Sequence, residues 1–80
     1  MAILHIKAKI TPWDDPEFVR AFDAARDQTV SEGFDDGPKG AAHVEHLLRA
    51  AGYPQATVGV DRTVKEALEQ TSHWLVSRDG

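Results

Sequence analysis

Two histidines with carboxylates close by are the residues of this chain best suited to chemistry. His43 and His46 stand three residues apart in the segment His43-Val44-Glu45-His46, and Asp35 and Asp36 lie just upstream. Side chains three apart on a helix are neighbours on one surface, so the two imidazoles can share a metal ion, with aspartate oxygens as further ligands. His43, His46, Asp35 and Asp36 therefore form a candidate site for a small ligand-binding or metal-binding protein or an enzyme.

The spacing of these histidines differs from that of known helical zinc sites. The zincin motif has histidines four residues apart around a glutamate, whereas Glu45 lies between histidines that are three apart. On a helical wheel His46 lies nearly opposite the apolar stripe of Val44 and Leu48, and His43 flanks that stripe. The competing interpretation is a pair of solvated surface histidines, and no cofactor is expected.

The glycine-rich segment 33–40 is the second candidate, because successive amides in such a turn before a helix can bind a phosphate. The phosphate-loop pattern is incomplete here. No Ser or Thr follows Lys39, the segment follows a predicted helix instead of a strand, and Asp35 and Asp36 would repel an anion. The alternating oxygen ligands and closing glutamate of a calcium loop are missing too. The segment is predicted to be a connection between two helices, and no acyl-transfer or phosphoryl-transfer motif favours an enzyme.

Composition restricts the chain to one small globular unit. With 80 residues, 41% of them hydrophobic and 28% charged, it can build one core, which predicts a single domain over residues 1–80. The absence of cysteine excludes a disulfide framework and thiolate zinc. A net charge of −4 disfavours nucleic acid as a partner. No apolar run approaches the roughly 20 residues of a membrane span, so a cytoplasmic protein without a membrane partner is expected.

Hydrophobic periodicity and turn residues predict three strands and three helices. Alternating residues predict strands over 3–10, 55–61 and 72–78. A first helix is expected from Pro16 to just before Gly33, and a second from Pro38 to Ala51, followed by Gly52. Thr63-Val64-Lys65-Glu66 matches a capping box and predicts a short third helix.

The resulting order is βααβαβ, which indicates an α+β fold with a three-stranded sheet and its helices packed on one face. A helix between the second and third strands can act as a crossover, so those two strands are predicted to be parallel and the connection right-handed. The position and direction of the first strand stay open.

The face of the sheet that the helices leave uncovered is the candidate interaction surface. If Trp74 and Val76 point toward the helices, the opposite face carries Ile3, His5, Lys7, Lys9, Thr57, His73, Leu75 and Ser77. Such a surface is more apolar than a typical solvated face and more polar than a core, as association surfaces often are. The alternative is a solvated face with a few scattered apolar residues.

Trp13, between Pro12 and two aspartates, is predicted to pack as a staple on the first turns of the following helix. The alternative is an exposed tryptophan that recognises a partner. In that case Trp13 belongs with the interaction surface.

These features favour a non-catalytic protein-interaction module or accessory subunit that binds a protein partner or a second copy of itself. The interaction residues predicted from sequence are Ile3, His5, Lys7, Thr57, His73, Leu75 and Trp13. An acidic inhibitor that offers carboxylates to a basic partner is a variant of this hypothesis. The alternative function uses the histidine and aspartate cluster described above.

Overall fold

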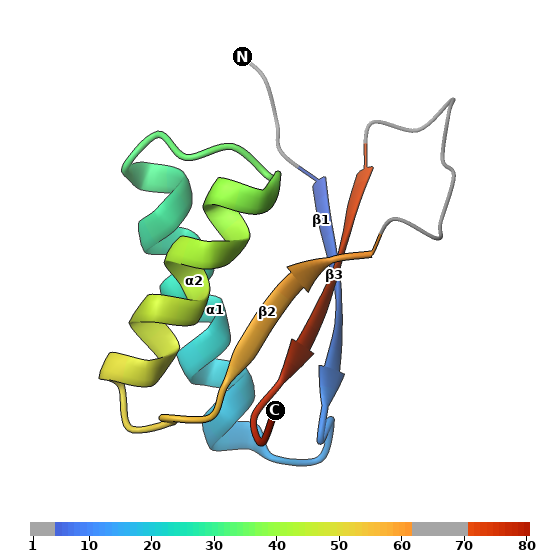
Figure 1. The fold of residues 1–80 in the computed structure, drawn as a ribbon, viewed down its shortest axis with the longest axis vertical. Coiled ribbons are helices and arrows are strands. Elements are labelled where there is room, and N and C mark those ends of the chain that lie inside the picture. Colours follow the sequence, from blue (N-terminus) through green and yellow to red (C-terminus); the bar gives the residue numbers. More distant parts are fainter. Residues whose placement is uncertain (1–4, 62–70) are drawn as a thin grey trace.

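The computed structural model describes residues 5–61 and 71–80 and has two helices and three strands (Figure 1). The elements in chain order are β1 (His5–Thr11), α1 (Pro16–Ser31), α2 (Pro38–Ala50), β2 (Thr57–Val60) and β3 (Thr71–Ser77). The predicted α+β fold in one small domain is confirmed. The third helix, predicted to begin at Thr63, lies outside the described residues.

The sheet has the strand order β1-β3-β2, so the last strand of the chain lies in the middle. β1 is parallel to β3, and β2 is antiparallel to β3. The prediction that β2 and β3 are parallel is therefore wrong. A parallel pair would require the connection after β2 to return along the full length of the sheet before β3 begins. Instead Val60, the last residue of β2, already pairs with Trp74, and the Asp61 N–H donates to the His73 carbonyl at 2.7 Å, which extends the antiparallel ladder.

Both helices lie on the same face of the sheet (Figure 1). The core between these two layers contains Phe18, Phe22, Ala25, Ala41, Val44, Leu48, Ala56, Val58, Trp74 and Val76. Successive strand residues point to opposite faces, so the inward positions of Trp74 and Val76 send their neighbours to the other side. The predicted orientation of β3 is correct.

Glycines end both helices where the sequence predicts. Gly33 and Gly52 have φ angles of 87° and 110°, in the left-handed region that glycine adopts without strain. After α1, the Phe34 N–H donates to the Thr29 carbonyl at 3.2 Å, which satisfies an acceptor of the last turn. Tyr53 makes the corresponding bond after α2. The chain thus leaves each helix in a fixed direction.

Trp74 connects the central strand to both helices and to the loop between them. Its side chain is 1% exposed, its indole N–H donates to the Asp36 carbonyl at 2.9 Å, and its ring meets that of Phe22 edge-on. A Cβ at Gly40, in the first turn of α2, would overlap the Asp35 carbonyl oxygen and touch the Trp74 ring. The close approach of loop, helix and indole therefore requires glycine at this position.

Gly40→Ala should destabilise the protein, although alanine is the better helix former by about 1 kcal/mol. The added methyl group overlaps backbone, and overpacking of this kind costs about 1–3 kcal/mol in the free energy of unfolding. Urea denaturation measures the loss. Gly59→Ala is the matched control, because its Cβ would meet nothing within 4 Å and the change should be neutral or slightly stabilising. Equal stability of the two variants would contradict the packing described around Gly40.

Candidate interaction site

The side of the sheet opposite the two helices is the candidate interaction site. Alternation along the strands directs Lys7 and Lys9 of β1 and His73 and Leu75 of β3 away from the core, because Ala8 and Trp74 pack into it. We refer to this surface as the outer sheet face; its members are Lys7, Lys9, Thr11, Thr57, Gly59, His73, Leu75 and Ser77. The structure thus brings together residues from both ends of the chain and from β2.

Strand register arranges these side chains in rows across the sheet. Lys9 pairs with Leu75, and Leu75 pairs with Gly59 on its other side. Lys7 pairs with His73 in the next row. Leu75 is 47% exposed, and Gly59 contributes no side chain beside it. The centre of the outer sheet face is therefore one leucine with an open flank toward β2 and a lysine toward β1.

Two shallow hollows meet at Lys9 and Leu75. The first is lined by Lys7, Ala8, Lys9, Asp61, His73, Trp74 and Leu75. The second is lined by Lys9, Thr11, Thr57, Leu75, Val76, Ser77 and Gly80. Sites for small molecules are concave and bury most of the ligand, whereas shallow surfaces suit contact with another macromolecule.

The charge of the outer sheet face differs from that of the whole chain. Lys7 and Lys9 are exposed, and they place two positive charges along β1 in a protein of net charge −4. Asp61 lies on the β2 side, where its backbone N–H bonds to the His73 carbonyl. The β1 side of the face is therefore locally basic.

Three residues predicted for the interaction surface are not among the described members of the outer sheet face. Ile3 lies outside the described residues. His5 begins β1 and pairs with Thr71, but its side chain is not described. Trp13 is 82% exposed, so the prediction that it packs as a staple is wrong. The inner side of the first turn of α1 is already filled, because the Phe18 ring meets Tyr53 edge-on at 5.0 Å.

Trp13 is also separate from the outer sheet face. It lines an apolar surface hollow together with Asp14, Pro16, Val19 and Arg20, and none of these residues lines the two hollows beside Leu75. The structure therefore does not bring Trp13 together with the other predicted interaction residues.

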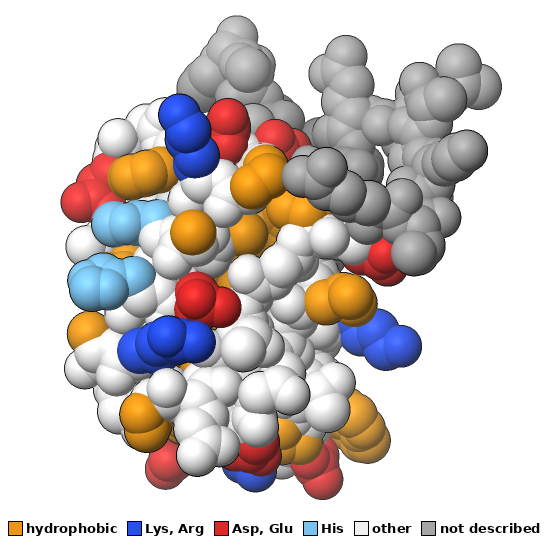
Figure 2. All heavy atoms as spheres, in the orientation of Figure 1, with side chains coloured by type: hydrophobic (Ala, Val, Ile, Leu, Met, Phe, Trp, Pro, Cys, Tyr) orange, Lys and Arg blue, Asp and Glu red, His pale blue; other side chains and the backbone are white. Residues whose placement is uncertain are grey.

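The two histidines of α2 lie in different surroundings. The His43 Nε2–H donates to Glu32 Oε2 at 2.7 Å, and its ring stacks on Phe34 with 4.4 Å between centroids. His46 is exposed. Figure 2 shows histidine side chains on the surface over α2, among acidic and basic side chains. One imidazole of the predicted site is thus held by a carboxylate and an aromatic ring.

The two predicted aspartate ligands take part in the turn before α2. Asp35 Oδ1 accepts from the Gly37 N–H at 3.0 Å, and the Asp36 carbonyl accepts from the Trp74 indole. Within residues 5–61 and 71–80, no three His, Cys, Asp or Glu side chains are grouped so that they could hold a metal ion. The predicted four-residue metal site is therefore not assembled among the described residues.

Zinc should leave the melting temperature unchanged, because His43 is engaged with Glu32 and binding would have to break that contact. Differential scanning fluorimetry with a zinc titration measures this, with His43→Ala and His46→Ala as the matched variants. A rise of several degrees that is lost in both variants would contradict the expectation and support the metal-binding alternative.

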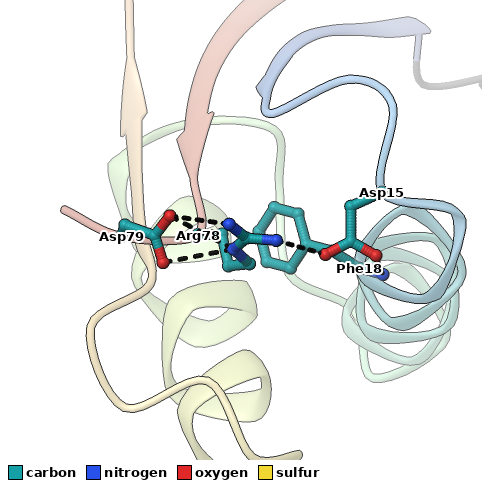
Figure 3. Close-up of polar contacts among 4 residues, drawn as sticks. All are labelled: Asp15, Phe18, Arg78 and Asp79. Carbon is teal, nitrogen blue, oxygen red and sulfur yellow. Dashed lines mark hydrogen bonds and ion pairs between the residues drawn. The ribbon is translucent and has the colours of Figure 1, made fainter.

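An arginine that the sequence did not single out lies at the carboxyl ends of β1 and β3 (Figure 3). The Arg78 guanidinium donates to Asp15 Oδ2 at 2.6 Å and to Asp79 Oδ2 at 2.9 Å. Asp15 also caps α1, since its Oδ1 accepts from the Phe18 N–H at 3.2 Å. The carboxyl end of a parallel strand pair is a common position for a bound ligand. Here the carboxylates of Asp15 and Asp79 already bind the arginine, and Asp15 also caps the helix terminus.

Arg78 favours the ionised form of the Asp15 carboxyl group. The hydrogen bond from Arg78, followed by that from the Phe18 amide, lowers the pKa of Asp15 below its ordinary value of 3.8. A carboxyl group with a lowered pKa in the folded state stabilises the fold at pH values above its unfolded pKa. This contribution is lost as the pH falls through the lowered folded pKa. The contribution of this ion pair to stability is therefore expected to be lost below about pH 4.

Asp15→Asn keeps an oxygen that can cap the helix but removes the ion pair with Arg78. The variant should be less stable than the wild type at neutral pH, and its stability should depend less steeply on pH below about pH 4. Urea denaturation across that pH range measures both effects. The neighbouring exposed carboxylate provides the control Asp14→Asn, which should follow the wild-type curve. Parallel curves for Asp15→Asn and the wild type would contradict the proposed role of the pair.

Comparison of the chain with protein-family models, curated proteins and solved structures finds no match. Among the helices of the described ranges, none combines the length and the apolar character that a bilayer span requires. A functional proposal for this chain therefore rests on the geometry and charge of its own surfaces. The outer sheet face combines an exposed leucine, two lysines and two hollows.

Proposed function

We propose that this protein is a non-catalytic interaction module that binds another protein through the outer sheet face. The observation that carries the proposal is the position of Leu75, half-exposed at the centre of the sheet side that the two helices leave open. An apolar side chain surrounded by polar and charged groups resembles the core and rim of a small protein interface. The two hollows beside Leu75 offer space for side chains of a partner.

The charges favour a partner with an acidic surface. Lys7 and Lys9 border the face along β1, so acidic side chains would meet opposite charge there. A two-fold dimer through the same face would put the lysines of both copies into one interface, whereas an acidic partner would supply only opposite charge there. An acidic protein is therefore the favoured partner, and a second copy of the chain is the alternative.

The size of the apolar contact favours a transient complex. Obligate interfaces resemble a domain core cut in half, whereas the outer sheet face presents one large exposed apolar side chain among the described residues, Leu75. Affinity on such a surface depends on charge complementarity, which salt screens.

Leu75→Glu should weaken binding of an acidic polymer to the outer sheet face about tenfold or more, because it removes the apolar contact and adds a repulsive charge. The probe is poly-L-glutamate, followed by amide chemical shifts of the labelled protein. In the wild type the shifts should concentrate at Lys9, His73 and Leu75.

Val30→Glu is the matched control for this experiment, since Val30 on α1 is 40% exposed and the change in net charge is the same. It should lower affinity much less than Leu75→Glu. Equal losses in the two variants, or shifts centred on other parts of the surface, would contradict the proposal.

Light scattering coupled to size exclusion distinguishes the two partners. A protein that stays monomeric up to about 1 mM has no self-association of biological strength, and the homodimer is then excluded. A dimer that Leu75→Glu dissociates and Val30→Glu does not would assign the face to a second copy.

A further inference from the structure

The two edges of the sheet differ in how their backbone hydrogen-bonding groups are paired. At the edge formed by β2, the Val58 N–H donates to Glu45 Oε1 at 3.1 Å. The Arg49 Nε–H donates to the Ala56 carbonyl at 3.1 Å, just before β2 begins. Side chains of α2 therefore take up hydrogen-bonding groups of this edge, one of the ways in which proteins protect edge strands.

The edge formed by β1 has no such protection among the described residues. Thr11 pairs with Ser77, and its carbonyl accepts from the Arg78 N–H, so the backbone polar groups of Thr11 face β3. Because these groups alternate along a parallel strand, Ile6, Ala8 and Ile10 direct their N–H and C=O groups away from β3. No hydrogen bond joins this outward row to any residue of 5–61 or 71–80.

The side chains along this edge have a definite chemical pattern. Lys7 and Lys9 are exposed on the outer sheet face, two residues apart and therefore side by side. Ala8 and Ile10 alternate with them on the opposite face, where they are partly buried against the core. The edge thus offers a row of backbone donors and acceptors with positive charge on one side and apolar surface on the other.

We propose that the β1 edge binds an extended acidic segment of the partner as a fourth strand of the sheet. Main-chain bonds to Ala8 and Ile10 would hold the segment, in the manner of known strand-addition complexes. Carboxylates at alternate positions would lie opposite Lys7 and Lys9, and apolar residues between them would extend the surface of Ile10. This inference rests on the proposed function and specifies the conformation and charge of the partner.

Charge complementarity selects this occupant over a second copy of the chain. Two β1 strands related by a two-fold axis must be antiparallel, and residues on the same face must be opposite each other. Pairing centred on Ala8 sets Lys7 of one copy opposite Lys9 of the other, and pairing centred on either lysine sets it opposite itself. Like charges directly opposite are destabilising, so the lysines disfavour self-pairing in these registers and favour a strand with carboxylates.

A synthetic peptide of the length of β1, in which glutamate alternates with valine, is the probe for the wild-type protein. Hydrogen exchange followed by NMR is the measurement. Added peptide should slow exchange of the Ala8 and Ile10 amides severalfold, because these point outward and gain acceptors. The amides of Lys7 and Lys9 already face β3, so their exchange should change much less.

Charge variants test the recognition of the carboxylates. Lys9→Glu should lower the affinity for the glutamate peptide about tenfold. A peptide with lysine in place of glutamate should then bind the variant better than the wild type. Lys39→Glu is the matched control, because Lys39 is exposed on α2 and the change in net charge is the same. It should leave the affinity within about twofold.

Backbone pairing is tested on the peptide itself, which avoids any change to the fold. The same peptide N-methylated throughout keeps its carboxylates, but its amide donors are gone and the methyl groups on its edge prevent the close approach of strand pairing, so it should not slow exchange at Ala8 or Ile10. Slowed exchange with the methylated peptide, or no slowing with the parent peptide, would overturn strand addition. Shifts at His73 and Leu75 without slowed exchange at Ala8 would overturn this inference and leave the proposed function standing. Loss of both responses would contradict both.

Discussion

The buried indole of Trp74 is the constraint on which the rest of this structure depends. A buried N–H without an acceptor costs about 1–3 kcal/mol, so the fold must bring a carbonyl to the indole nitrogen. Asp36 supplies it from the loop before α2. That loop can approach only because Gly40 has no side chain. Phe22 then closes the other side of the ring from α1. One side chain of β3 thereby fixes both helices against the sheet.

The position of Trp74 also determines the outer sheet face. Strand residues alternate, so an inward Trp74 forces His73 and Leu75 outward, and pairing with β1 sets Lys7 and Lys9 beside them. The interaction surface is therefore a geometric consequence of the core. Strand pairing fixes the backbone of this surface, so ordering the backbone adds little to the entropic cost of binding a partner.

Glu45 shows how a motif with catalytic associations can have a structural role. The sequence places it between His43 and His46, where a metal-site hypothesis looks for a general base or a ligand. In the fold its Oε1 accepts from the Val58 N–H, and its Oε2 lies 3.6 Å from the Arg49 guanidinium nitrogen Nη2. The orientation of α2 that holds Glu45 against β2 leaves His46 exposed to solvent. Glu45 therefore has a structural role, because its carboxylate pairs a backbone group of the β2 edge.

The sequence predicts those features whose causes are local. Proline and glycine mark the limits of α1 and α2 because their effects on φ act within one turn. Alternation predicts correctly which residues of β3 face the helices. The direction of β2 relative to β3, the pairing of Arg78 with Asp15 and the exposure of Trp13 depend on residues far apart in the chain. Asp15, directly before Pro16, is of a residue type that caps helices, but nothing near it in sequence indicates a partner 63 residues away.

The contrast between the two sheet edges links protection from aggregation to recognition. An edge strand exposes hydrogen-bonding groups, and lysines are a common means of preventing two copies from pairing there. Lysines repel only strands of like charge, however, and a strand with carboxylates meets the same groups favourably. In a chain of net charge −4, these lysines stand out against the negative charge of the protein as a whole. An acidic partner must overcome that long-range repulsion, so binding depends on short-range contacts at β1, and screening by salt weakens the repulsion and the attraction together. The edge residues that disfavour self-association are thus the residues that give this surface its specificity.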